Sequence, residues 1–301
     1  MVWRANQQLT QGSMAKRSTV PHGAKALPIG AALLIAVALA ACGSGSSGGT
    51  SGSGGSPSGK HAPASLVVGT TSDPGTLDWQ VRASSTTYAA GSPAYDDLVA
   101  FNEAGNKIVP YVAKSWVATP AATPKKIVFT LKSGVTCSDG TPVTPRVVYN
   151  SMQRFLTVPK LQNGVNNLFG AGPFKLSYSN SADTFTISSK APFATMLQGF
   201  TQAGIICPAG LKAVAKNKTA LQTAQYGSGP YTFVSYTPGQ SIVWKKRAGW
   251  NWGPPGADIK TMPDSLTWKI VPDETTLAQE ILTGQVNMAS VSGPDVPRLA
   301  S

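Results

Sequence analysis

Residues 43 to 59 consist only of Gly, Ser, Thr and Pro. A tract of this composition cannot bury an apolar core, so it is expected to behave as a flexible linker. It separates a short N-terminal part of the 301-residue chain from a longer C-terminal part. Apolar residues make up 42% of the chain, which is enough for a core of ordinary size. We therefore expect the folded domain within residues 64–301 and the linker within residues 42–63.

The segment before the linker has the three parts of an export signal. Lys16, Arg17 and Lys25 form a basic start, residues 26 to 41 are apolar, and small residues come just before the linker. The apolar run is shorter than the roughly 20 residues that a membrane-spanning helix needs. The pattern predicts a signal peptide over residues 1–41, with translation starting at Met14.

The four residues from Leu39 to Cys42 resemble the bacterial lipobox, in which the cysteine sulfur receives a diacylglyceryl group. This resemblance implies lipidation of Cys42, which becomes the new N-terminus. A flexible linker directly after a lipidated cysteine keeps a domain close to partners in the membrane. We therefore predict an exported protein that is lipid-anchored to the outer face of the cytoplasmic membrane.

Both histidines, His22 and His61, precede the first strand-like segment. The expected domain then contains no imidazole, which excludes Ser-His-Asp and Cys-His triads and His-ligated metal sites. The sequence also has no Cys-x-x-Cys pair and no phosphate-binding loop with its lysine. We expect no metal, no cofactor and no enzymatic activity. Two alternatives stay open: a secreted cell-envelope hydrolase with a carboxylate pair, and a basic wall-associated adhesin.

The chain is basic, with 25 Lys and Arg against 13 Asp and Glu and a formal net charge of +12. Along the sequence the basic residues of the domain are scattered, with short clusters at 125–126 and 245–247. No basic stripe alternates with aromatic residues, as it does in many nucleic-acid-binding proteins. We expect no nucleic-acid partner.

Apolar residues alternate with polar ones over several short stretches, which predicts half-buried strands. Pro238 and Gly239 stand where a type II turn requires them, so the stretches on either side are expected to form a hairpin. Trp116, Trp244 and Trp268 are expected in the core. The predicted strands cover residues 65–69, 127–131, 185–187, 231–236, 241–244, 266–271 and 285–289.

Two helices are predicted from their caps and apolar stripes. The first begins at Pro145 after Thr144, and the second covers residues 274–283 between Asp273 and Gly284. The second helix is expected to bury Leu277, Ala278, Ile281 and Leu282. Because it lies between two predicted strands, it completes a β-α-β unit, and the fold class is a mixed α/β fold.

Cys137 and Cys207 are the two cysteines of the expected domain. Exported chains reside where disulfides persist, so we expect the two residues to form a disulfide bond. Two unlinked buried thiols remain the alternative.

Several segments, taken in order, resemble the family 5 solute-binding proteins of bacterial ABC importers. Residues 66–78 resemble the family's opening strand and turn, and residues 94–99 resemble the following helix and loop. The most specific segment is 129–144, which is close to the family's signature pattern. Residues 227–231, 270–273 and 282–287 continue the series, so the resemblance covers nearly all of the expected domain.

This resemblance implies a periplasmic-binding-protein-like (type II) clamshell. Family members have two lobes, and this sequence matches the first lobe with its inserted subdomain, with the second lobe largely missing. The implied function is the capture of peptides or similar small solutes for an ABC permease in the membrane. Nickel or haem is a less expected solute, because the domain has no histidine to serve as a ligand.

The resemblance also implies that first-lobe contacts to the solute come from two segments at strand ends. These are the turn 71–76 and the segment 85–95, in which Tyr88 is the leading aromatic candidate. Ordinary packing in the core is the alternative for this tyrosine. The expected ligand-binding residues are Thr71, Ser72, Thr76, Ser85, Tyr88 and Tyr95.

Overall fold

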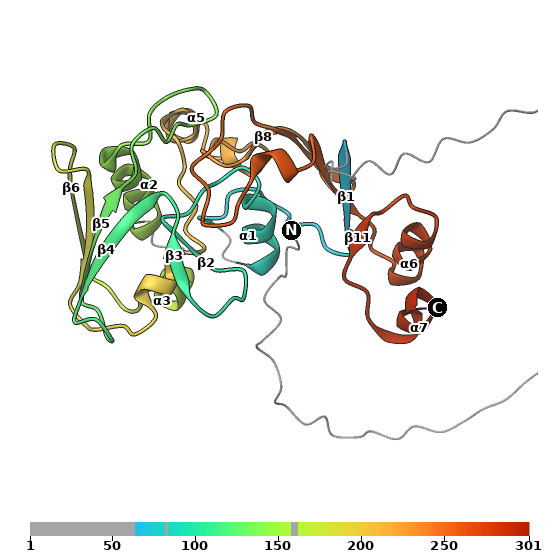
Figure 1. The fold of residues 1–301 in the computed structure, drawn as a ribbon, viewed down its shortest axis with the longest axis horizontal. Helices are drawn as coiled ribbons and strands as arrows, with labels where there is room; N and C mark the ends of the chain where they lie inside the picture. The colour runs from blue at the N-terminus through green and yellow to red at the C-terminus, as the bar shows by residue number, and fades with distance from the viewer. Residues whose placement is uncertain (1–63, 82–83, 158–161, 301) are drawn as a thin grey trace, which may run out of the picture. The chain divides into compact units, whose positions relative to one another are not determined.

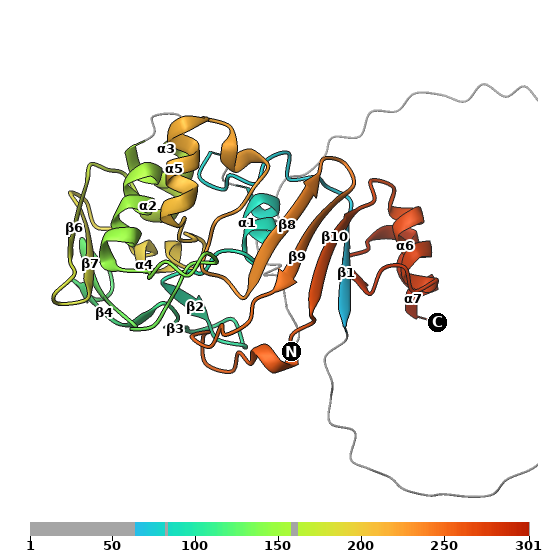
Figure 2. The same cartoon turned by 90° about the horizontal axis from the view of Figure 1, so that it is seen from above.

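The structure is a computed structural model that describes residues 64–81, 84–157 and 162–300. The predicted signal peptide, Cys42 and the linker lie outside the described residues. In the described part, two larger sheets and a two-stranded one, with their helices, form the α/β fold predicted from the sequence, as Figures 1 and 2 show.

The first sheet has five strands in the order β11-β1-β10-β9-β8. Strand β1 runs parallel to both of its neighbours, β10 and β11, whereas β10, β9 and β8 are successively antiparallel. The carboxyl ends of β1, β10 and β11 therefore meet at one edge. The bounds are β1 Ser65–Thr70, β8 Tyr231–Thr237, β9 Ser241–Lys246, β10 Ser265–Ile270 and β11 Met288–Ala289.

The predicted hairpin is confirmed by the pairing of β8 with β9. In its turn, the Gln240 amide donates to the Thr237 carbonyl at 3.0 Å, and Gly239 has a φ of 71°. A positive φ at this position is what a type II turn needs and what glycine adopts without strain.

The second sheet has four antiparallel strands in the order β4-β5-β7-β6. Its strands all lie between β1 and β8 in the sequence. In both views this sheet and α2 lie at one end of the described fold, and β1, β11 and α6 lie at the other (Figures 1 and 2). The bounds are β4 Ala113–Thr119, β5 Lys126–Leu131, β6 Phe174–Ser179 and β7 Thr184–Ser189, with a small hairpin of β2 Val99–Phe101 and β3 Ile108–Pro110.

The helices are short apart from α2, which packs on one face of the four-stranded sheet. The predicted stripe of α2 is confirmed, because Val148, Met152 and Phe155 are fully buried. The helices are α1 Ser85–Gly91, α2 Pro145–Thr157, α3 Gln162–Phe169, α4 Met196–Gly199, α5 Pro208–Lys216, α6 Glu274–Leu282 and α7 Val296–Ala300, with 3-10 turns η2 Ala220–Gln222, η3 Ile259–Thr261 and η4 Gly293–Asp295.

The β-α-β unit forms as predicted, with α6 connecting β10 to β11 across β1. The Asp273 carboxylate accepts a hydrogen bond from the Thr276 amide at 2.7 Å, which confirms the predicted cap. Two details were wrong. Leu282, which was expected to be buried, is the last residue of the helix and is 51% exposed. The last strand has only two residues, because the side chain of Asn287 replaces a strand contact by accepting from the Val67 amide.

The larger core lies between the four-stranded sheet and the helices. Phe200 contacts Phe129 and Phe169 there, with ring centroids 4.7 Å apart in each pair. Of the three tryptophans expected in the core, Trp244 is fully buried, and Trp116 and Trp268 are half-buried.

In this structure Cys137 and Cys207 are joined by a disulfide bond, with Cα atoms 6.1 Å apart. Both residues are buried, and the bond connects the loop after β5 to the start of α5. Within the described ranges, no helix is both long and apolar enough to cross a membrane. The same residues contain no group of three or more His, Cys, Asp or Glu that could hold a metal ion.

Candidate functional site

The candidate site lies at the edge where the parallel strands β1, β10 and β11 end. In open α/β sheets, ligands bind beyond the carboxyl ends of such strands. Here the chain leaves β1 at Thr70 and runs through residues 71–80 before α1 begins at Ser85. This segment therefore carries most of the side chains that could face a ligand.

Asp73 fixes the first half of the segment to the β8–β9 hairpin. Its carboxylate accepts hydrogen bonds from the Tyr236 hydroxyl and the Gly239 amide, each at 2.5 Å, and from the Gly75 amide at 2.6 Å. Burial and the contact with Asp73 raise the pKa of Tyr236, so the phenol stays protonated and donates. The predicted turn 71–76 is thus held by contacts to a hairpin far away in the sequence.

The second half of the segment is held against α2 by a buried ion pair. Both terminal nitrogens of the Arg154 guanidinium donate to the carboxylate of Asp78, at 2.6 and 3.0 Å. Arg154 also donates to Gln80 at 2.7 Å, and the Gln80 amide donates to the Ser151 carbonyl at 2.9 Å. Asp78 is only 1% exposed, so this pairing satisfies a charge that would otherwise be buried alone.

Four of the six residues predicted to bind a ligand reach the surface here. Ser72 and Ser85 are exposed, and Thr71 and Tyr88 are half-buried. Ser85 opens α1 directly after Ser84, whose hydroxyl accepts from the Thr87 amide at 3.2 Å. Whether these four residues contact a solute stays a prediction.

The other two predicted residues are buried and need correction. Thr76 is 7% exposed, and its hydroxyl accepts from the Asp78 amide at 3.2 Å. Tyr95 is 4% exposed and points into the core, where its hydroxyl accepts from the Tyr226 amide at 3.3 Å. Gly227 leaves room for this ring, since a Cβ at that position would lie 2.5 Å from it. We therefore leave Thr76 and Tyr95 out of the candidate site.

Three polar atoms beside this segment are buried and have no hydrogen-bond partner among the described residues. They are the indole nitrogen of Trp79, the hydroxyl of Tyr88 and one carboxylate oxygen of Asp97. The rings of Trp79 and Tyr88 lie 5.9 Å apart, and burial together with the charge of Asp97 raises the pKa of Tyr88. An unpartnered buried polar atom is costly, so each of the three calls for water or a ligand group.

Trp79 and Asp97 were not among the residues predicted from the sequence to bind a ligand. Each follows a residue with a structural role, Asp78 in the ion pair and Asp96 in the core. The only sequence signal was the pair of adjacent acids at 96 and 97, in a chain with 13 acidic residues. Burial raises the pKa of Asp97 well above its ordinary value, and the neighbouring charge of Asp96 adds to this effect.

Asp96 is fully buried and joins three segments of the chain. Its carboxylate accepts hydrogen bonds from the Tyr111 hydroxyl, from the Trp250 indole at 3.3 Å and from the Trp252 indole at 2.7 Å. Burial raises the pKa of Asp96 to about 6, and these hydrogen bonds only partly offset the shift.

This shift predicts the pH dependence of stability. A carboxyl group whose pKa is higher in the folded state than in the unfolded state binds its proton more tightly when folded. Its contribution to the stability of the fold therefore weakens as pH rises. Ionisation of Asp96 should lower the free energy of unfolding by about 2–3 kcal/mol between pH 4 and pH 7. The substitution Asp96→Asn leaves one donor without its acceptor at every pH, but it removes this ionisation. The variant should therefore be destabilised most at pH 4 and least at pH 7, measured by urea denaturation. A larger loss at pH 7 than at pH 4 would contradict the raised pKa.

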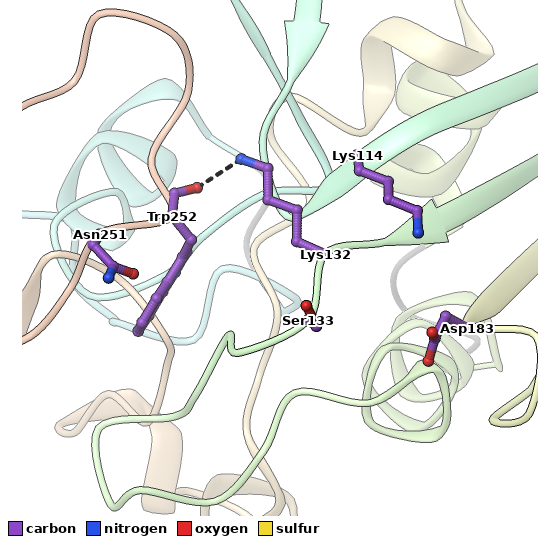
Figure 3. A pocket seen from close by; sticks show the side chains of 6 residues that line it. All are labelled: Lys114, Lys132, Ser133, Asp183, Asn251 and Trp252. Carbon is purple, nitrogen blue, oxygen red and sulfur yellow. Dashed lines mark hydrogen bonds between the residues drawn. The ribbon is translucent and has the colours of Figure 1, made fainter.

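A separate depression of about 520 Å³ is lined by residues of β4, the end of β5, the turn before β7 and the loop after β9. The Lys132 ammonium donates to the carbonyls of Trp252 at 2.9 Å and Gly253 at 3.2 Å, as Figure 3 shows for Trp252. Its lining is mostly polar and exposed, unlike the apolar walls of typical ligand pockets, so we do not assign the solute to it. The lining residues are Lys114, Lys132, Ser133, Asp183, Asn251 and Trp252.

Comparison with known proteins identifies the family. The model of the bacterial extracellular solute-binding proteins, family 5 (middle part), matches residues 107–301. The chain belongs to this family. Because family 5 proteins are extracellular, this chain is an exported protein.

Individual relatives resemble this chain in sequence and in fold. The chain is 33% identical over 186 residues to the probable D,D-dipeptide-binding periplasmic protein DdpA of Escherichia coli K12, covering 59% of this chain and 35% of that protein. A substrate-binding protein from Microbacterium hydrocarbonoxydans, solved with 4-hydroxybenzoate hydrazide, is 27% identical with a TM-score of 0.67, covering 78% of this chain and 48% of that one.

The fold extends to more distant solved structures. DppA from Helicobacter pylori, solved with the peptide STSA, is 20% identical with a TM-score of 0.61, covering 75% of this chain and 46% of that one. The chain thus spans about a third to a half of the length of the relatives it matches. The periplasmic-binding-protein-like fold predicted from the resemblance is confirmed.

Proposed function

We propose that this chain is the substrate-binding lipoprotein of an ABC importer and that it captures peptides or similar small solutes. The observation that carries the proposal is membership of family 5 over residues 107–301, together with a polar site at the strand ends. No covalent chemistry is needed for this role. Binding and release through lobe closure are sufficient.

A peptide fits the chemistry of the unpartnered atoms. The Trp79 indole can only donate, the Asp97 carboxylate can only accept when ionised, and the Tyr88 hydroxyl can do both. A peptide main chain presents N–H donors and C=O acceptors in alternation, so it can satisfy all three. Thr71, Ser72 and Ser85 add hydroxyls along the same edge. The dipeptide-binding relative and the peptide-bound neighbour support the same ligand class.

Peptide binding should depend on Asp97 and Tyr88. We expect Asp97→Asn and Tyr88→Phe each to weaken the affinity for a short peptide by about tenfold, since one hydrogen bond to a buried group is lost. The affinity is measured by calorimetry on the full-length exported protein with a pool of di- to pentapeptides.

The matched control for this experiment is Tyr178→Phe, which removes the same hydroxyl from a tyrosine of β6 that is 40% exposed. Unchanged affinity in both site variants, in a protein that binds peptide, would remove Asp97 and Tyr88 from the site. A protein that binds no peptide would contradict the proposed ligand class.

The lipid anchor is the finer part of the proposal and rests on the residues from Leu39 to Cys42. Cells fed a clickable palmitate should label the wild-type protein and leave Cys42→Ser unlabelled. Export of the unlabelled variant into the medium would show that secretion itself is intact. Equal labelling of both proteins would contradict lipidation at Cys42.

A further inference from the structure

The basic residues of this chain are concentrated in one part of it. Between Glu103 and Asp258 the sequence has sixteen Lys and Arg but only two acidic residues, Asp139 and Asp183. All of β4, β5, β6 and β7 lie in this interval. The part of the chain that contains the four-stranded sheet therefore carries a net positive charge.

The strand register gathers four lysines at one end of this sheet. Lys126 of β5 and Lys175 of β6 both lie opposite Ser188 of β7, one on each side. Adjacent strands are about 4.8 Å apart, so the two lysine Cα atoms are separated by about 10 Å. Lys125 precedes Lys126, and Lys190 follows the end of β7. All four side chains are exposed, and none forms an ion pair within the described ranges.

One face of the sheet is covered and the other is not. Tyr149 of α2 contacts Tyr178 of β6 with ring centroids 5.0 Å apart, and Phe185 and Ile187 of β7 are fully buried on the same side. Successive side chains of a strand point to opposite faces, so the residues between these lie on the outer face. In Figures 1 and 2, no helix of the described part covers that face.

Hydroxyl groups dominate the outer face. Two further rows of the register place Thr130, Thr184 and Ser179 together, and Val128, Thr186 and Ser177 together. Asp183 directly precedes β7, at the end of the sheet opposite to the four lysines. The six hydroxyl residues of the three rows are Thr130, Ser177, Ser179, Thr184, Thr186 and Ser188.

We infer that this outer face docks onto a hydrated polyanion that carries both phosphate and hydroxyl groups, the chemistry of a polyol-phosphate polymer. The lysines at the sheet end attract the phosphates, and the Ser and Thr hydroxyls donate to phosphate and to polyol oxygens. The patch lies at the opposite end of the described fold from β1, so its role is separate from solute capture (Figure 1).

The composition of the face favours a polymer over a lipid surface. Proteins that bind at a membrane surface insert Trp, Phe or Leu side chains below the headgroups. The apolar residues of the outer face are only Val117 and Val128. The outer face also offers no aromatic side chain on which nucleic-acid bases could stack, since the three rows contain none.

The test compares Lys126→Ser/Lys175→Ser with Lys216→Ser/Lys218→Ser in the full-length protein. The control variant removes the same charge from exposed lysines at the end of α5 and just beyond it. Binding to a poly(glycerol phosphate) oligomer is measured at several salt concentrations. The patch variant should bind about 10- to 30-fold more weakly at low salt and with a shallower salt dependence, whereas the control should change less than threefold.

Three further probes separate the contributions. Thr186→Val keeps the shape of the side chain and removes its hydroxyl, so we expect a loss of about threefold. Neutral dextran should not bind, and phosphatidylglycerol vesicles should bind more weakly than the polymer. Equal losses in the patch and control variants would overturn the inference, and so would unaltered binding in the patch variant. Tighter binding to vesicles than to the polymer would assign the face to a membrane instead.

Discussion

We expect the substitution Arg154→Met to lower the free energy of unfolding by about 3–5 kcal/mol. Its two hydrogen bonds to Asp78 are the main compensation for a carboxylate that is 1% exposed. Removing one partner of a buried ion pair leaves an uncompensated charge, which is far more destabilising than the loss of an exposed pair. The change is measured by urea denaturation followed by circular dichroism.

Two variants make this result specific to the buried pair. Asp264→Asn breaks the contact between Lys246 and Asp264, whose carboxylate side chain is 71% exposed, and should cost at most about 1 kcal/mol. Arg154→Met/Asp78→Asn removes both charges, so it should recover a large part of the stability lost in Arg154→Met. If the single variant were as mild as Asp264→Asn, the ion pair would not hold the candidate site against α2.

The variant Cys137→Ala/Cys207→Ala should lose about 4 kcal/mol of stability. The two residues are 70 positions apart, and a crosslink that closes a loop of this length restricts the unfolded chain strongly. The melting temperature should fall by about 10 °C in a domain of this size. Differential scanning calorimetry under non-reducing conditions measures both quantities.

The single variant Cys207→Ala should lose as much as the double variant, because one substitution already removes the bond. Alkylation of the secreted protein, unfolded in denaturant without reductant, should modify neither Cys137 nor Cys207. If mass spectrometry found both thiols modified, the alternative of two unlinked buried thiols would be correct instead. Wild type and double variant would then melt at similar temperatures.

Much of the local structure could be predicted because its causes lie within a few residues. The type II turn at Pro238 and Gly239, the cap at Asp273 and the buried stripe of α2 depend on contacts between sequence neighbours. Strand alternation in β5, β7 and β9 is likewise a local pattern. The predicted strand 285–289 is shorter in the structure, where the side chain of Asn287 accepts from the Val67 amide.

The candidate site was less predictable, because burial is decided by distant parts of the chain. Thr71, Ser72, Ser85 and Tyr88 are exposed or half-buried, and their contact with a solute stays a prediction. Tyr95 is buried because Gly227, more than a hundred residues away, leaves space for its ring. The polar atoms of Trp79 and Asp97 are buried without a partner because of tertiary packing, which no local sequence pattern indicates.

The sequence by itself determined the α/β class, the absence of histidine from residues 64–301 and the family, since each depends on composition or on ordered motifs. Only the tertiary structure decided which charges come together. Lys126 and Lys175 are 49 positions apart and looked scattered, yet the register places them on either side of Ser188. The physical reason is that β-sheet pairing joins residues by backbone hydrogen bonds between strands, whatever their separation along the chain.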